Sequence, residues 1–129
     1  EYRSERYGFS LFYPEDLTTR DIDEGGGAAT ITFENAAAAR GFQMFIVPYE
    51  GTQVSEERFL KDAPSGVREA PEDFYLDGVL ATAFYSRDVF LGETREVWFI
   101  QNGFLFELTT VRGLDAWLAE IMRSFRFVN

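Results

Sequence analysis

Two glutamates in the second half of the chain have the type and spacing for acid–base chemistry. Glu96 and Glu107 lie on either side of an Asn-Gly pair, each within an apolar run, and Trp98 is close to Glu96 in sequence. Glycoside hydrolases use two such carboxyl groups, one as an acid and the other as a base or nucleophile. These residues support one hypothesis for the function, a carboxylate-dependent hydrolase that uses Glu96 and Glu107.

A second acidic group lies at Asp21–Glu24, directly before three glycines. Calcium takes several oxygen ligands from a sharply turning segment, which makes a calcium-binding module a second alternative. The match to a calcium loop is incomplete, because Gly25 occupies the third ligand position and Thr32 replaces the final glutamate. The favoured interpretation of this segment is a solvated acidic turn.

The composition excludes several kinds of active site. The chain contains no histidine and no cysteine. A Ser-His-Asp triad, a Cys-His pair and an ordinary zinc site therefore cannot be built. The glycines form neither a GxGxxG nor a P-loop pattern. We expect no catalytic residue, no metal ligand and no cofactor in the favoured interpretation.

A predicted β-hairpin positions the two glutamates. Asn102-Gly103 is a strong hairpin signal, because both positions of its turn need positive φ. Counting outward from Gln101 opposite Phe104 places Glu96 and Glu107 on one face, diagonal to each other across neighbouring strands. The same face carries Trp98, Ile100, Leu105 and Thr109, and the opposite face carries Val97, Phe99, Phe104, Phe106 and Leu108.

Both faces of this hairpin are apolar near the turn, so we expect a layer on each side of it. Residues 114–125 have apolar side chains at helical spacing, and a second helix is predicted to begin at the N-cap Ser55 and to end before Pro64. The predicted fold class is α+β, an α/β/α sandwich with a central antiparallel sheet, in one domain over residues 1–129. Further strands are expected at residues 8–13, 17–23, 28–34, 42–47 and 79–88, with 17–23 as the hairpin partner of 8–13.

The formal net charge of −10 makes nucleic acid and anionic membranes poor partners. Most aromatic side chains are expected in the core. Four lie next to turn signals and are candidates for an exposed contact patch: Tyr49, Phe74, Tyr75 and Phe90.

Three motifs along the chain resemble those of PsbP-like domains. They are YGFSLFYP at 7–14, LDG at 76–78 with Ala81 after it, and NGF at 102–104 followed by SFRF at 124–127. The resemblance implies an α/β/α sandwich around an antiparallel sheet. Members of the family include extrinsic subunits of photosystem II and bacterial extracytoplasmic lipoproteins, and the photosystem members are assembly and cofactor-retention factors rather than enzymes. No site residue is carried over, because the family's metal contacts rely partly on histidine and its docking uses basic residues.

These observations favour a non-catalytic binding or scaffolding domain that contacts a protein or a small ligand at the cell envelope. We expect an extracytoplasmic location and a membrane association only through an anchor upstream of the chain. The candidate contact residues are Tyr49, Phe74, Tyr75, Phe90, Glu96, Trp98 and Glu107.

Overall fold

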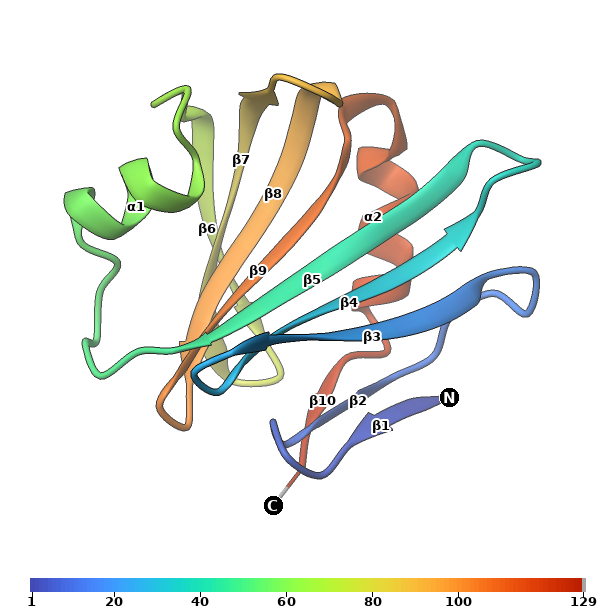
Figure 1. Cartoon of the computed structure of the whole chain (residues 1–129), viewed down its shortest axis with the longest axis horizontal. Helices are drawn as coiled ribbons and strands as arrows, with labels where there is room; N and C mark the ends of the chain where they lie inside the picture. Colours follow the sequence, from blue (N-terminus) through green and yellow to red (C-terminus); the bar gives the residue numbers. More distant parts are fainter. Residues whose placement is uncertain (129) are drawn as a thin grey trace.

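The computed structural model describes residues 1–128 as two antiparallel sheets and two short helices (Figure 1). The main sheet has seven strands in the order β3-β4-β5-β9-β8-β7-β6, and the small sheet has the order β1-β2-β10. The elements are β1 (Tyr2–Ser4), β2 (Phe9–Leu11), β3 (Thr18–Gly25), β4 (Ala28–Asn35), β5 (Arg40–Pro48), α1 (Glu56–Asp62), β6 (Glu69–Leu76), β7 (Val79–Asp88), β8 (Gly92–Gln101), β9 (Phe104–Val111), a 3₁₀ turn (Arg112–Leu114), α2 (Asp115–Met122) and β10 (Arg126–Phe127).

The main sheet joins two runs of sequential hairpins. One run is β3-β4-β5 and the other is β6-β7-β8-β9. The connection that contains α1 leads from β5 to β6 at the far edge, and the second run returns until β9 pairs with β5. The β8–β9 hairpin therefore lies inside the sheet, with strands on both sides.

The predicted hairpin is confirmed residue by residue. Gln101 pairs with Phe104, and Glu96 pairs with Thr109. The turn residues Asn102 and Gly103 have φ values of 54° and 79°. The Asn-Gly turn thus sets the register by which Glu96 and Glu107 come to the same face.

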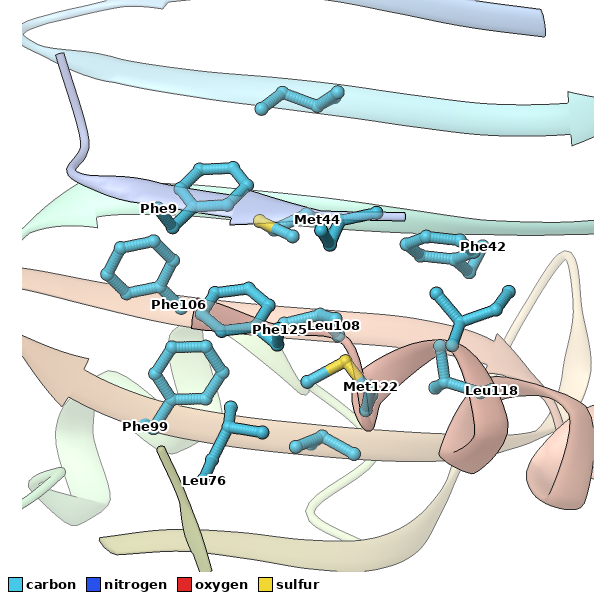
Figure 2. Close-up of a cluster of buried hydrophobic side chains, with 14 of the residues drawn as sticks. Phe9, Phe42, Met44, Leu76, Phe99, Phe106, Leu108, Leu118, Met122 and Phe125 are labelled. Atoms are coloured by element: carbon cyan, nitrogen blue, oxygen red, sulfur yellow. The ribbon is translucent and has the colours of Figure 1, made fainter. Parts of the chain in front are cut away.

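The larger core lies on the face of the main sheet that α2 covers, here called the α2 face. Figure 2 shows Phe99, Phe106 and Leu108 of the sheet beneath side chains of α2 and of the small sheet. The Phe9 and Phe125 rings stack in parallel with their centroids 5.3 Å apart, and Phe99 stacks on Phe106 at 4.8 Å. The small sheet is thus held against the main sheet by aromatic packing.

A smaller core lies on the opposite face, here called the α1 face. Phe59 and Ala63 of α1 pack on Phe84, Trp98 and Leu105. The Ser55 hydroxyl caps the helix by accepting a hydrogen bond from the backbone N–H of Arg58 at 3.1 Å, as the sequence predicted. Leu60 of the same helix is about half exposed.

The fold is dominated by antiparallel sheet. Its two short helices cover less of the sheet than the predicted α/β/α sandwich requires. The helix predicted over residues 114–125 ends at Met122, and Phe125 enters the larger core from the segment between α2 and β10. Part of the α2 face is covered by the small sheet instead of by helix.

Two strand predictions were wrong. Residues 17–23 do not pair with residues 8–13: β3 pairs with β4 at the edge of the main sheet, and β2 pairs with β1 and β10. All three residues of β2 are buried, so packing on the larger core decides its place. Strand β6 was missed, because Pro71 and its acidic residues are typical of a loop; an edge strand tolerates both.

No helix within residues 1–128 is long and apolar enough to cross a lipid bilayer.

Candidate functional site

A pocket of about 360 Å³ opens on the α1 face, where the short helix α1 ends. Its lining includes Glu96, Glu107 and Thr109 from the central strands. Lys61 and Asp62 at the end of α1, together with Arg87 and Asp88 at the end of β7, also line it. We call this hollow the carboxyl pocket. Helix α1 has only seven residues, so it covers the part of the face around Trp98 and Leu105 and leaves the part around the glutamates open.

Glu96 is held by hydrogen bonds from its own sheet. Its Oε1 accepts from Trp98 Nε1 at 3.0 Å and from the Thr109 hydroxyl at 2.7 Å. Burial raises the pKa of Glu96 above its ordinary value, and these donated hydrogen bonds oppose the shift because they stabilise the charged carboxylate. Glu96 is therefore positioned by groups on β8 and β9 themselves.

Glu107 is buried with fewer partners. Its side chain is 5% exposed, and its Oε2 receives no hydrogen bond from any group within residues 1–128. Burial raises the pKa of Glu107 to about 10, and the neighbouring Asp62 carboxyl adds to the shift. The raised pKa favours the protonated, neutral form of Glu107 at neutral pH.

Asp62 forms an ion pair with Arg58 within α1. Arg58 Nε donates to Asp62 Oδ2 at 2.8 Å, and both side chains are largely buried. The guanidinium stabilises the Asp62 carboxylate, and that carboxylate in turn favours the proton on Glu107. The site thus contains an Arg58–Asp62–Glu107 chain that links helix α1 to the centre of the sheet.

The structure brings together the two glutamates that the sequence singled out, and a pocket lies at the end of the hairpin where the hydrolase hypothesis requires one. A catalytic carboxyl pair normally has environments that push the two pKa values apart. Here burial pushes the pKa values of both Glu96 and Glu107 upward. The two carboxyl groups share this effect of burial, and they differ in the hydrogen bonds that only Glu96 receives.

The four aromatic contact candidates do not form one patch. Tyr49 is half-buried, and its hydroxyl donates to the Gln53 carbonyl and accepts from the Ser55 N–H, so it braces the segment that leads into α1. Phe74 is half-buried against the larger core. Tyr75 and Phe90 are exposed, but they lie near opposite ends of β7, a ten-residue strand that spans about 30 Å.

Trp98 is also a structural residue. It is buried against Phe59 and Phe84, and it is not among the residues that line the carboxyl pocket. Trp98 thus lies beside both glutamates, as the hairpin register predicts, but its indole ring packs in the smaller core and its N–H orients Glu96.

The exposed residue Phe90 belongs to an apolar loop that the sequence prediction covered only in part. Residues 89–91 connect β7 to β8, with Val89 91% exposed and Phe90 93% exposed. Asp88 Oδ1 accepts hydrogen bonds from the backbone N–H groups of Phe90 and Leu91 at 2.8 and 3.0 Å. A signal for the loop was present in the sequence: three apolar residues between Asp88 and Gly92 sit in a turn too short to return them to either face of the sheet.

The segment Asp21–Glu24 is neither the solvated acidic turn that the sequence favoured nor the sharply turning segment that a calcium loop requires. It is extended and belongs to edge strand β3, and its carboxylates are used locally. Asp21 accepts from the Tyr2 hydroxyl, Asp23 from the Gly25 N–H and Glu24 from the Thr30 hydroxyl. Within residues 1–128, no group of three or more Asp or Glu side chains is arranged to hold a metal ion.

No protein-family model matches the sequence, and no curated protein matches it either. Among solved structures, the chain is similar to the solution structure of cyanobacterial PsbP (CyanoP) from Synechocystis sp. PCC 6803. The TM-score is 0.66, the match covers 98% of this chain and 90% of that chain, and the sequence identity is 18%. A match over nearly the whole length at so low an identity is a likeness of fold. The chain therefore has the fold of a PsbP-like domain, as its three sequence motifs predicted.

Proposed function

We propose that this chain is a non-catalytic protein-binding domain and that the 89–91 loop makes its main partner contact. The observation that carries this proposal is the nearly complete exposure of Val89 and Phe90 on a backbone fixed by Asp88. Burying one such side chain against a partner contributes roughly 1.5–3 kcal/mol. The fixed backbone reduces the entropy that binding would cost.

The partner that fits this loop has an apolar pocket surrounded by basic residues. The exposed side chains form a protruding tip, which requires a concave apolar site on the other protein. The net charge of −10 favours a positively charged partner surface and disfavours anionic lipid as the apolar surface.

The absence of catalysis is part of the proposal. Its support is the lack of histidine and cysteine and the upward pKa shifts of both glutamates in the pocket. An assay panel for hydrolysis of glycosides and esters is expected to show no turnover by the purified domain.

The carboxylate-dependent hydrolase is the second candidate, because Glu96 and Glu107 both line the carboxyl pocket. Hydrolysis by the wild-type protein that is lost in a folded Glu107→Gln variant would replace the first proposal with this one.

We also propose that the domain is displayed outside the cytoplasm, at the cell envelope, through an anchor upstream of Glu1. This rests on the resemblance of its motifs to those of extracytoplasmic PsbP-like proteins. A lipobox or a membrane span encoded upstream is the expected finding, and a preceding cytosolic domain would contradict it.

Binding is tested by crosslinked capture from the envelope fraction, followed by calorimetry with the purified candidate partner. Phe90→Ala is expected to weaken binding about tenfold or more, because the loss of a contact worth ~1.4 kcal/mol changes Kd tenfold. Tyr75→Ala is the matched control, since it removes another exposed aromatic side chain near the opposite end of β7. Equal Kd values for wild type and Phe90→Ala, or no captured partner, would contradict the proposed role of the loop.

A further inference from the structure

We propose that the carboxyl pocket binds a cationic nitrogen group, a guanidinium or an alkylammonium, presented as a side chain by the protein that docks on the 89–91 loop. The identity of the presenting molecule rests on the proposed function, whereas the cation site itself does not. The inference is carried by a buried carboxyl oxygen without a donor, in a pocket whose walls hold more carboxyl groups than cations.

The unpartnered atom is Glu107 Oε2. It belongs to a residue that is 95% buried, lies on central strand β9 and lines the pocket. A buried acceptor without a donor is unfavourable, because water was removed from it and nothing replaced the lost hydrogen bond. An N–H group in the pocket that Glu107 lines would supply that hydrogen bond once the side chain turns Oε2 towards it.

The charges around Glu107 determine the kind of donor. The pocket lining carries carboxyl groups from β3, α1, β7, β8 and β9, namely Glu24, Asp62, Asp88, Glu96 and Glu107. Lys61 and Arg87 are the cations in that lining, and Arg58 lies behind Asp62. Even with Glu107 neutral, four other carboxyl groups line the pocket with two cations, which favours a positively charged ligand over a neutral or negative one.

Several of these carboxyl groups are already occupied, which restricts where the ligand can bind. Glu24 accepts from Thr30, Asp88 from the 89–91 loop, and Glu96 from Trp98 and Thr109. Asp62 Oδ2 accepts from Arg58, so Glu107 and the other oxygen of the Asp62 carboxyl remain as the acceptors that a ligand can use. Two acceptors side by side suit the paired N–H donors of a guanidinium or the three of an ammonium group.

A metal ion fits less well than a nitrogen cation. Hard divalent cations need several converging oxygen ligands, and no such group occurs in residues 1–128. A guanidinium or an ammonium group needs only two or three acceptors together with room for its carbon chain. The pocket offers about 360 Å³, and apolar walls at Phe45 and Leu91 suit an aliphatic stem.

The position of the pocket connects it to the proposed partner contact. Leu91 belongs both to the 89–91 loop and to the wall of the carboxyl pocket. A protein that covers Phe90 therefore has its neighbouring side chains at the mouth of the pocket. A lysine or an arginine at that place would bring its charge to Glu107 and Asp62.

Binding of a cation also moves a proton. Glu107 holds its proton through burial and through Asp62, and a cation beside it favours the charged carboxylate instead. The proton leaves to solvent as the ligand's N–H donor takes its place. At pH 7, binding is therefore expected to release up to about one proton for each ligand bound.

The first experiment titrates the wild-type domain at low salt with N-acetyl-arginine amide and with N-acetyl-norleucine amide, a neutral analogue. Calorimetry in two buffers of different ionisation enthalpy counts the released protons. We expect saturable binding of the arginine derivative, release of protons, and at least tenfold weaker binding of the norleucine derivative. Absence of saturable binding, or equal binding of the neutral analogue, would overturn the proposal.

Two variants separate the site from general charge attraction. Glu107→Gln keeps the size of a neutral Glu107, so its fold is expected to survive while cation binding weakens at least tenfold and proton release disappears. Glu120→Gln removes one charge from the solvent side of α2, on the opposite face, and is expected to bind as the wild type does. Equal losses in both variants would mean that only the overall charge attracts the ligand.

A parallel titration with putrescine distinguishes the source of the cation. Tighter binding of the arginine derivative supports a protein side chain as the source of the cation. Clearly tighter binding of putrescine would keep the cation site but would contradict a protein as its source. Phe90→Ala should leave binding of both small ligands unchanged. A failed cation titration therefore leaves the 89–91 loop proposal standing, and a failed Phe90→Ala test leaves the cation site standing.

Discussion

At the scale of single residues, Glu107 differs most from its ordinary behaviour. It is an acidic residue that the fold keeps neutral, through burial and through the charged Asp62 beside it. Glu96 lies on the neighbouring strand β8, diagonal to Glu107 on the same face, and receives hydrogen bonds that favour its charge. Two residues of one type therefore have different roles, because only Glu96 has donors within its own hairpin.

The raised pKa of Glu107 predicts how stability changes with pH. Between its ordinary value of 4.5 and about 10, the folded state holds a proton that the unfolded state releases. The unfolding free energy attributable to this group therefore falls as pH rises through that window, by at most about 1.4 kcal/mol per pH unit. Glu107→Gln removes this dependence and should gain stability relative to wild type as pH increases.

Urea denaturation of both proteins at pH 5, 7 and 9 measures this difference, and other titrating groups largely cancel in the comparison. Glu120→Gln serves as the control, since its exposed side chain is expected to give the same pH profile as the wild type. A difference between Glu107→Gln and wild type that stays constant with pH would mean that Glu107 is charged in the folded protein.

At the scale of elements, the β8–β9 hairpin positions both the larger core and the carboxyl pocket. Its turn sets a register that sends Phe99, Phe106 and Leu108 to the α2 face and the two glutamates to the α1 face. A shift by one residue would exchange the two faces. The turn is consequently the element on which the candidate site depends most.

Gly103→Val is expected to destabilise the fold by at least ~1 kcal/mol, because a β-branched residue resists the positive φ of this turn. A Cβ atom at position 103 would meet no heavy atom within 4 Å, so the cost is backbone strain and not a clash. Gly113→Val is the matched control, since that position is equally open and its φ is not positive. Thermal denaturation that gives the same loss for both variants would contradict the assignment to strain.

At the scale of the whole molecule, aromatic packing joins the small sheet to the main sheet. Phe125 has no exposed surface and contacts Phe9 of the small sheet as well as Phe99 of the main sheet. The chain thereby brings its two ends together over the core that the central strands supply. The edge strands β3 and β6 carry charged residues, and β6 contains Pro71, which hinders edge-to-edge association.

Phe125→Ala is expected to cost about 3–5 kcal/mol, as truncation of a fully buried phenylalanine usually does. Phe12→Ala is its control, because that phenylalanine lies next to the small sheet but is 62% exposed. Urea denaturation should show a large loss for Phe125→Ala and a small one for Phe12→Ala. Similar small losses would mean that the small sheet is not coupled to the main core.

The sequence by itself determined the features that depend on neighbours along the chain. The Asn102-Gly103 turn, the pairing register of residues 96–109, the Ser55 cap and the strand over residues 79–88 all follow from local turn chemistry and side-chain alternation. The placement of Glu96 and Glu107 on one face is part of the same local geometry.

Only the tertiary structure decided which distant segments meet. The pairing of β9 with β5, the position of β3 at an edge and the approach of Asp62 to Glu107 join residues far apart in sequence. Such contacts form where they bury the most apolar surface across the whole chain, and no local pattern encodes that sum. For the same physical reason, the sequence singled out Glu96 and Glu107, but only the fold buries Glu107 beside Asp62 and thereby raises its pKa.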